Sequence, residues 1–326
     1  MRSLKIEALR ELTDRIMDGY RLKPEDPEVQ DLLTQDLAEL QQEAGRLQKH
    51  FCGNHVDFCT IINARSGRCG ENCKYCAQAA CHHTGCEEYG FLSKEEVMKT
   101  AKADQDAGAN RFAMVTSGRA LTGKDFEKAL DIYKAMKKDL TIDLCASHGI
   151  ISREQFRRLR EAGVTSYHHN IETSRRYFPQ ICTSHTFDDR IRTIKAAQAE
   201  GVCVCSGGII GMGETWQDRL DMAFTLQSLG IESIPINALM AIPGTGMEGR
   251  KPLPAEDILR TIAIFRFINP TANIRLAAGR KLLPKNGATA LLAGASASIT
   301  GNMLTTSGTT IKDDMEMLKE LGLTNH

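Results

Sequence analysis

Short apolar runs alternate with amphipathic segments along most of the chain, and this alternation constrains the fold more than any other feature. Eight runs have the length and composition of buried strands: Phe58–Asn63, Arg111–Thr116, Thr141–Ser147, Ser166–Glu172, Val202–Ile210, Ser233–Leu239, Ile274–Ala278 and Ala290–Ala293. Segments with helical spacing lie between them: Lys94–Ala107, Gly123–Lys137, Ser152–Ala162, Phe187–Ala199, Thr215–Leu229 and Ala255–Ile268. This order predicts an α/β fold, namely a (β/α)8 TIM-type barrel.

Glycines at the ends of the predicted helices support this division of the chain. Gly108, Gly163, Gly201 and Gly230 stand where a helix C-terminus favours glycine. A doubly wound open sheet is the alternative architecture for the same alternation. No G-x-G-x-x-G motif follows the first predicted strand, and its absence argues against the dinucleotide-binding form of that sheet.

The N-terminal part of the chain lacks these strands and is predicted to be helical. Leucines between residues 32 and 47 recur at roughly helical spacing. Pro24 and Pro27 separate a first short helix from a second. We therefore expect an N-terminal helical cap over residues 1–56 and the barrel over residues 57–326.

Composition sets limits on the partners of this chain. Lys and Arg together number 41, as do Asp and Glu, so the formal net charge is zero. Such a balance gives no reason to expect nucleic acid or an anionic membrane as partner. Charged residues interrupt the N-terminal segment, unlike the apolar core of a signal peptide. With 11 cysteines and no secretion signal, we expect a cytoplasmic protein whose thiols are metal ligands or buried side chains.

A knot of three cysteines follows the first predicted strand. Cys69, Cys73 and Cys76 are spaced C-x3-C-x2-C, and soft thiolates suit iron–sulfur clusters or zinc. A closed structural zinc site needs four ligands, whereas three thiolates on a four-iron cluster leave one iron open for chemistry. The alternative is a zinc site completed by His82 or Cys86, and a structural disulfide is a weaker one.

With Tyr75 immediately before the third cysteine, the knot resembles the motif of the radical S-adenosylmethionine (SAM) superfamily. That resemblance implies a 4Fe–4S cluster whose open iron binds SAM. An electron from the cluster then cleaves SAM to a 5′-deoxyadenosyl radical. In the predicted barrel, the loop after the first strand lies at the C-terminal end of the strands, which is the catalytic face.

Two polar or glycine-rich segments end predicted strands at the same face. The segment 207–215, GGIIGMGET, closes the fifth strand. It is either a tight turn with Glu214 at a helix start or, beside a radical SAM cluster, a SAM-binding strand in which Ile209 packs on adenine. In the segment 167–173, YHHNIET, alternation sends His168, Asn170 and Glu172 to one face. These polar groups suit a bound ribose or ureido group, or else a satisfied polar core network.

Four further cysteines and an arginine fall on predicted strands: Cys59, Cys145, Cys203, Cys205 and Arg275. A single cysteine is more often a small core side chain than a ligand. Together on the strands of one barrel, the five residues are candidates to hold a second cluster in the interior.

Over nearly its whole length the chain resembles the biotin synthase family. The resemblance rests on seven stretches: Asn63–Cys76, His169–Ser174, Cys205–Thr215, Pro235–Asn237, Pro243–Thr245, Arg275–Arg280 and Leu304–Thr306. It implies a homodimeric barrel enzyme, a sulfurtransferase that inserts sulfur into two unactivated C–H positions of dethiobiotin. Two SAM molecules supply the radicals, an auxiliary Fe–S cluster supplies the sulfur, and flavodoxin or ferredoxin is the expected type of electron donor.

The resemblance also implies roles for individual residues. Cys69, Cys73 and Cys76 would hold the SAM-cleaving cluster, and Tyr75 would lie by the adenine. The remaining contacts would be Asn170 and Glu172 with the SAM ribose, Asn170 and Asn237 with the ureido ring, and the backbone amides of Thr305 and Thr306 with the substrate carboxylate. The family commonly has Asp where this chain has Glu172.

One position departs from the family's pattern. The usual auxiliary 2Fe–2S cluster has three cysteines and an arginine as ligands, and Cys145, Cys205 and Arg275 match three of them. The fourth position, on the second predicted strand, is Ala113, which cannot bind iron. We therefore expect a four-iron auxiliary cluster held by the thiols of Cys59, Cys145, Cys203 and Cys205, with Arg275 beside it. The alternative is a 2Fe–2S cluster on Cys145, Cys205, Arg275 and one substitute thiol.

Two other functions stay open at this point. The first is a radical SAM maturase or mutase that acts on an amino-acid-derived substrate, which would not need the interior cysteines. The second is a non-catalytic metal-binding scaffold, which would not need the glycine-rich fifth strand or the polar fourth strand.

Overall fold

A computed structural model describes residues 6–301 and 309–325 of the chain. Nine parallel strands form one sheet in the order β5-β4-β3-β2-β1-β9-β8-β7-β6, and pairing of β5 with β7 closes it into a barrel. The strands are β1 Asp57–Arg65, β2 Arg111–Thr116, β3 Asp143–Ser147, β4 Ser166–His168, β5 Cys203–Cys205, β6 Gly208–Ile210, β7 Ser233–Ala238, β8 Asn273–Leu276 and β9 Ala297–Ile299. Because β5 and β6 are two parts of one interrupted strand, the described part of the chain forms a barrel of eight strands, here called staves. The predicted fold class is therefore confirmed.

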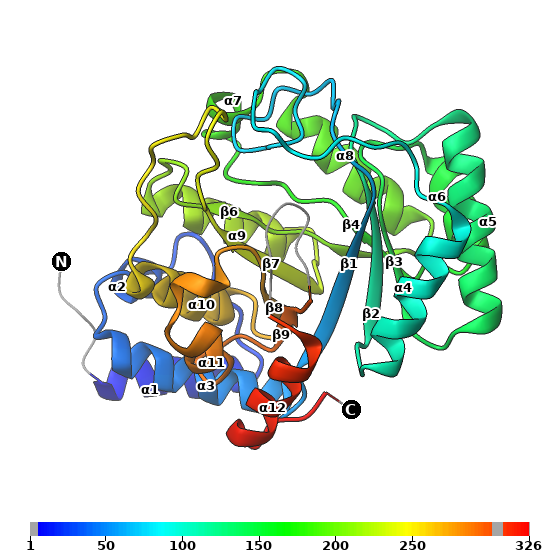
Figure 1. Ribbon diagram of the computed structural model, residues 1–326. Coiled ribbons are helices and arrows are strands. Elements are labelled where there is room, and N and C mark those ends of the chain that lie inside the picture. The colour runs from blue at the N-terminus through cyan, green and yellow to red at the C-terminus, as the bar shows by residue number, and fades with distance from the viewer. Residues whose placement is uncertain (1–5, 302–308, 326) are drawn as a thin grey trace.

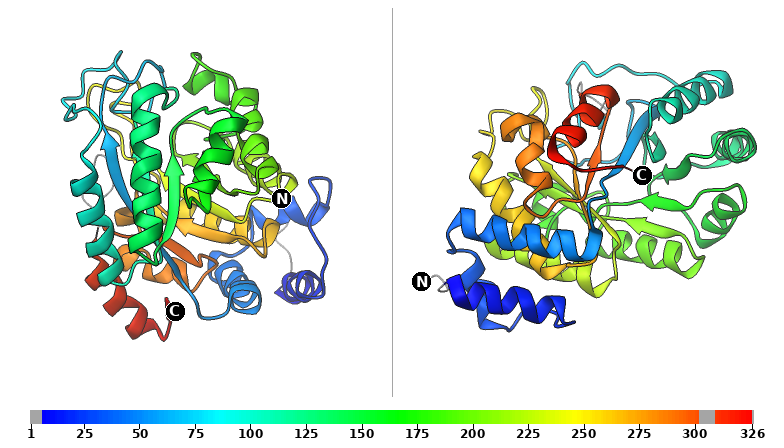
Figure 2. Two further views of the ribbon diagram at one scale, coloured as in Figure 1. Left: turned by 90° about the vertical axis from the view of Figure 1, so that its right-hand side faces the viewer. Right: turned by 90° about the horizontal axis from the view of Figure 1, so that it is seen from below.

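Helices surround the barrel and connect its strands (Figures 1 and 2). Those between strands are α4 Lys94–Asp106, α5 Gly123–Asp139, α6 Arg153–Glu161, α7 Phe178–Ile181, α8 Phe187–Ala199, α9 Trp216–Ser228, α10 Ala255–Ile268 and α11 Ala288–Leu291, and α12 Ile311–Leu321 follows the last strand. Two short 3-10 helices, η1 Arg280–Leu282 and η2 Pro284–Gly287, precede α11. Capping boxes fix several helix starts, at Ser93, Ser152, Thr186, Thr215 and Thr310.

The N-terminal helices lie at the end of the barrel opposite the cysteine loop, which Figure 1 shows in cyan at the top. They are α1 Ile6–Met17, α2 Pro27–Leu32 and α3 Leu37–Cys52, and α3 packs against both α1 and α10. The second predicted helix is therefore two helices. Asp36 separates them because its side chain accepts hydrogen bonds from the backbone N–H groups of Ala38 and Glu39. The division into a cap (1–56) and a barrel (57–326) stays a prediction.

The eighth predicted strand, Ala290–Ala293, is wrong. Residues 288–291 form α11, and the last stave is β9 at 297–299. Alanine and leucine are good helix formers, whereas β9 is only three residues long. Its Ser298 and the preceding Ser296 are small polar residues that conceal the buried position of this strand. Buried arginines explain those residues, because Arg280 donates to Ser298 Oγ at 3.1 Å and Arg266 donates to Ser296 Oγ at 3.0 Å.

Two other predicted strands are shorter than expected. The fourth ends at His168 rather than at residue 172, and the fifth is interrupted at residues 206–207. Both breaks have one cause, which is that Asn170 Oδ1 accepts a hydrogen bond from Gly207 N at 3.0 Å and joins the two segments through a side chain. The backbone at Glu172 then takes a positive φ of 71°, which no strand allows.

Gly207 is required by close packing at this break. A Cβ atom there would lie 2.0 Å from the carbonyl oxygen of Pro235, and a backbone carbonyl within the barrel cannot move aside. We expect Gly207→Ala to destabilise the fold by about 1–3 kcal/mol and to lower the melting temperature. The matched control is Gly90→Ala, where an added Cβ meets nothing within 4 Å. Equal melting temperatures of the two variants would contradict this account.

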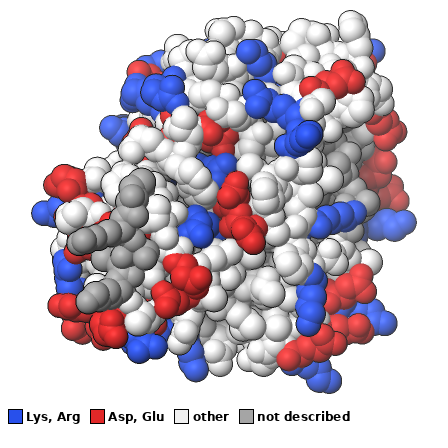
Figure 3. Space-filling model, turned by 90° about the vertical axis from the view of Figure 1, so that its left-hand side faces the viewer, with Lys and Arg blue, Asp and Glu red and all other residues white. Residues whose placement is uncertain are grey.

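Acidic and basic side chains are interspersed on the face that Figure 3 shows. Among the helices at residues 6–301 and 309–325, none is long and apolar enough to cross a membrane.

Candidate active site

One cavity of about 510 Å³ occupies the barrel and reaches the cysteine loop at the C-terminal end of β1. Every candidate site residue within the described ranges lines it: Cys59, Cys69, Cys73, Tyr75, Cys76, Cys145, Asn170, Glu172, Cys203, Cys205, Ile209, Asn237 and Arg275. Thr305 and Thr306 lie outside the described residues. The closed barrel thus brings together side chains from segments that are up to about 200 residues apart in sequence.

Backbone hydrogen bonds within the cysteine loop hold its three thiols toward the cavity. Cys69 N donates to the carbonyl of Gln78 at 3.0 Å, Ala80 N donates to the carbonyl of Cys69 at 2.8 Å, and Cys76 N donates to the carbonyl of Cys73 at 3.0 Å. These bonds curl the loop back on itself, so that sulfurs separated by three or four residues face one space.

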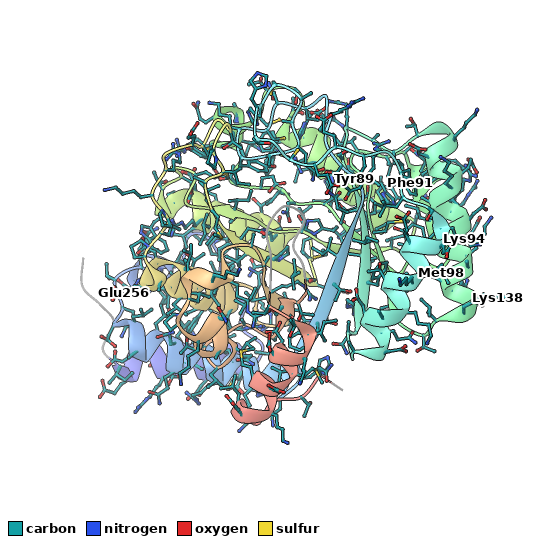
Figure 4. All side chains as sticks on the ribbon, in the orientation of Figure 1. Tyr89, Phe91, Lys94, Met98, Lys138 and Glu256 are labelled. Atoms are coloured by element: carbon teal, nitrogen blue, oxygen red, sulfur yellow. The ribbon has the colours of Figure 1, made fainter. Side chains whose placement is uncertain are left out.

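The end of the cysteine loop is tied back to the strand from which it starts. Tyr89, labelled in Figure 4, lies above the C-terminal end of β1. Its hydroxyl donates to the carbonyl of Asn63 at 2.7 Å, and its backbone pairs with Ser66. The loop is therefore anchored to the barrel at both ends.

The zinc alternative finds no support in this loop. The Nδ1 atom of His82 is 2.8 Å from the carbonyl oxygen of Cys76 and is occupied by that hydrogen bond. In the described ranges, the group with metal-binding spacing that includes a knot cysteine is Cys73 with Cys182 and His185. His82 and Cys86 are not part of it, so three thiols facing one cavity fit a cluster with one open iron.

Asn170 and Glu172 are held side by side above the barrel. Asn170 Nδ2 donates to Glu172 Oε2 at 3.3 Å, and Glu172 Oε1 lies 3.3 Å from Arg190 Nη1. Arg190 also donates to the backbone carbonyl of Asn170 at 2.7 Å. The strand pattern had not indicated Arg190, which reaches this site from α8.

The alternation expected for residues 167–173 is only partly right. Tyr167 and Ile171 are buried in the core, as expected, but His168 and His169 both line the cavity. Alternation fails because β4 ends at His168. Burial lowers the pKa of His169 well below its ordinary value, and its Nε2 atom is buried with no partner within the described structure. A neutral imidazole with an unsatisfied nitrogen is ready to bind a polar ligand group.

Ile209 and Asn237 line the cavity from the opposite strands. They pair with each other in register between β6 and β7. Asn237 Nδ2 donates to the carbonyl of Gly208 at 3.1 Å, and Asn237 Oδ1 accepts from Ala278 N at 3.1 Å. The glycine-rich segment is thus a strand that continues the barrel, with its apolar side chain exposed to the cavity.

The interior thiols gather lower in the barrel. Cys59, Ala113 and Cys145 pack together as a small buried cluster, with Ala113 directly opposite Cys145 in the register of β2 and β3. A hydrogen bond with Cys145, reinforced by burial, raises the pKa of Cys59 well above its usual value. Cys205 lines the same cavity, and although burial opposes ionisation, a hydrogen bond with His168 lowers its pKa.

Arg275 is fully engaged by neighbouring oxygen atoms. Its Nη2 atom donates to Asp57 Oδ1 at 2.5 Å, its Nη1 atom donates to the carbonyls of Asp57 and Ser298, and its Nε atom donates to Ser233 Oγ at 3.3 Å. Burial opposes ionisation of Asp57, but Arg275 and Arg111 keep its pKa below the ordinary value. The acidic partner Asp57 was not identified from the sequence.

Cys203 differs from the other interior thiols. It is exposed, lies at the start of β5 and pairs in register with Ser166. Burial and the nearby carboxylate of Glu232 raise its pKa. It nevertheless lines the cavity.

A parallel (β/α)8 barrel with three thiols in the loop after β1 defines a radical SAM enzyme. Family models agree, since the Radical SAM superfamily matches residues 64–226 and the Biotin and Thiamin Synthesis associated domain matches residues 235–324. The chain is 54% identical to biotin synthase of Alkaliphilus metalliredigens, covering 96% of this chain and 98% of that protein. It is 52% identical to biotin synthase of Clostridium beijerinckii, covering 96% and 99%. The chain belongs to the biotin synthase family.

Solved structures with the same fold are more distant. Methylornithine synthase is 20% identical with a TM-score of 0.82, covering 97% of both chains. The hydrogenase maturase HydG is 18% identical with a TM-score of 0.81, covering 98% of this chain and 76% of the maturase. At such identities the likeness shows the fold alone, so the maturase or mutase alternative gains nothing from it.

Proposed function

We propose that this chain converts dethiobiotin to biotin by radical sulfur insertion. The 13 candidate residues that line the barrel cavity would bind the clusters, SAM and the substrate. The observation that carries the proposal is the single cavity shared by the cysteine loop and the interior thiols. A radical formed from SAM must meet the intended C–H bonds before it meets water. A substrate bound in one cavity, between the cysteine loop and the interior thiols, meets that requirement.

In this proposal Cys69, Cys73 and Cys76 hold the 4Fe–4S cluster. When bound there, the cluster supplies the electron that cleaves SAM to a 5′-deoxyadenosyl radical. Tyr75 and Ile209 would contact the adenine. Each residue reaches the same cavity, and the cysteine loop is anchored by its own backbone hydrogen bonds, which limits movement of the ligands.

Asn170, Glu172 and Asn237 would bind the polar groups of SAM and substrate. Asn170 and Glu172 would meet the ribose hydroxyls, and Asn170 and Asn237 the ureido ring. The ion pair with Arg190 supports this role, because it fixes the carboxylate of Glu172 before any ligand arrives. Thr305 and Thr306 keep their proposed role as amide donors to the substrate carboxylate.

For the auxiliary cluster, which is consumed as the sulfur source, we propose the four-iron form. Cys59 and Cys145 are close enough to interact and pack around Ala113, where the family's usual ligand is missing. Cys205 supplies a third thiol, and Cys203 a fourth from the exposed end of β5. Arg275, whose N–H groups already donate to oxygen atoms, would stand beside the cluster and offset its negative charge.

The test of the reaction is anaerobic turnover of the reconstituted protein with dethiobiotin, SAM and a reductant. We expect biotin, with two SAM molecules consumed for each product. A thiolated intermediate that accumulates with one SAM spent would also support the proposal. Formation of 5′-deoxyadenosine without any sulfur-containing product from dethiobiotin would contradict it.

Three further proposals concern the electron donor, the oligomeric state and the cellular compartment. A flavodoxin or ferredoxin would deliver the electron, the enzyme would act as a homodimer, and it would work in the cytoplasm. Each follows from the family resemblance, and the interspersed surface charges of Figure 3 are compatible with a protein partner.

A further inference from the structure

A buried thiol that the proposed chemistry does not use lies directly behind the cysteine loop. Cys182 follows α7, and its sulfur lies 3.7 Å from the sulfur of Cys73, within hydrogen-bond distance for sulfur. Only 4% of Cys182 is exposed. Among the described residues that line the cavity, Cys73 is included and Cys182 is not. Cys182 therefore approaches Cys73 from the side away from SAM and substrate.

A dense set of hydrogen bonds holds Cys182 in this position. Asn72, inside the cysteine loop, accepts on Oδ1 from the backbone N–H groups of residues 183 and 184, at 3.0 Å each. Asn72 N donates to Ser184 Oγ at 3.1 Å, and Lys74 N donates to the carbonyl of Ile181 at 2.9 Å. The segment 181–184 is thus docked rigidly on the loop that carries the cluster ligands.

The same residues could at first sight form a site for a single metal ion. Ligand atoms of Cys73, Cys182 and His185 all lie within 4.8 Å of one another. However, Arg190 Nε donates to His185 Nε2 at 3.0 Å, and a guanidinium has no acceptor atom. The ring proton of His185 is therefore on Nδ1, which faces the carboxylate of Glu71. A metal ion on Nδ1 would leave the ring with no N–H at all, so the group is a hydrogen-bonded one.

Hydrogen-bond counting then assigns the proton of the Cys182 thiol. Its sulfur lies 3.5 Å from Asn72 Oδ1, 3.5 Å from Ser184 Oγ and 3.4 Å from His185 Nδ1. Because His185 Nδ1 carries the ring proton, it cannot accept the thiol proton. Asn72 Oδ1 already has two backbone donors, and Ser184 Oγ already has one. An iron-bound Cys73 has no proton and carries negative charge, which makes it the strongest acceptor in reach.

We propose that the Cys182 thiol donates a hydrogen bond to the Cys73 sulfur of the SAM-cleaving cluster and thereby raises the reduction potential of that cluster. Cys182 acts through Cys73 and is a positioning residue. Reduction adds negative charge to the cluster and its thiolates, and a hydrogen bond to sulfur stabilises that charge. The proposal rests on the placement of the cluster on Cys73.

The test is an anaerobic redox titration of the cluster followed by electron paramagnetic resonance, in a Cys145→Ala background that removes the auxiliary signal. We expect Cys182→Val, which keeps the site filled with an apolar side chain but removes the donor, to lower the ratio of reduced to oxidised cluster at a fixed potential by about threefold or more, as for the loss of one hydrogen bond. Cys182→Ser, which restores a donor, should recover most of that ratio. Cys81→Ala, an exposed thiol of the same loop, should leave it unchanged.

Two results would overturn the proposal: an unchanged ratio in Cys182→Val, or equal losses in the Val and Ser variants, which would indicate packing alone. If Cys182→Val does not load a cluster, the test is a comparison of the proton hyperfine spectra of the parent protein and of Cys182→Ser. The parent should then show a proton coupling that exchanges in D2O and changes in the Ser variant, and identical couplings would equally overturn the proposal. The underlying placement is tested separately, because Cys73→Ala should abolish the cluster signal whatever Cys182 does.

Discussion

Replacing Cys73 with Ala is expected to abolish reductive formation of 5′-deoxyadenosine. Cys73 is one of three thiols that face the cavity from the loop after β1, and two thiolates cannot hold a four-iron cluster with a single open iron. We expect the rate to fall by more than about 100-fold, which exceeds the loss typical when a residue that merely supports a metal ligand is removed. The measurement is SAM cleavage with dithionite under strict exclusion of oxygen.

The matched control for this variant is Cys81→Ala, which removes an exposed thiol twelve positions after Cys69 in the same loop. It should cleave SAM at the parent rate after the same reconstitution. Undiminished cleavage by Cys73→Ala would show that the cluster is held elsewhere and would undo the proposed site.

Replacing Cys145 with Ala should separate the two halves of the reaction. Cys145 lies deep in the barrel beside Cys59 and Ala113, away from the cysteine loop. We expect SAM cleavage to persist while biotin formation is lost, and the iron content to fall from about eight to about four per chain, because each cluster has four irons. Iron and sulfide analysis with Mössbauer spectra, together with product analysis, measures both effects.

The control for Cys145→Ala is Cys52→Ala, in α3 outside the barrel interior. It should retain both clusters and both activities. About six irons in the parent chain, with a two-iron Mössbauer signature that survives Cys203→Ala, would contradict the four-iron auxiliary cluster. That result would favour the 2Fe–2S alternative with Arg275 as a ligand.

The sequence by itself determined the features that depend on neighbouring residues. The barrel class followed from apolar runs of strand length alternating with amphipathic helices. Four of the five capped helix starts lie within a few residues of predicted ones, and the fifth, at Thr310, begins a helix that was not predicted. The cysteine knot was equally evident, because its three thiols lie within eight consecutive residues and their spacing is a local property. The main error, at residues 290–293, arose where local helix propensity and a strand of small residues lie next to each other.

Only the tertiary structure decided which distant residues meet. Cys73 and Cys182 are 109 positions apart, and Asp57 and Arg275 are 218 positions apart, so no local pattern links either pair. Their contacts depend on the register at which eight staves close and on where β5 breaks at Gly207. A shift of one residue in that register would turn every interior side chain outward. The sequence therefore determined which chemical groups this chain possesses, and closure of the barrel determined which of them act together.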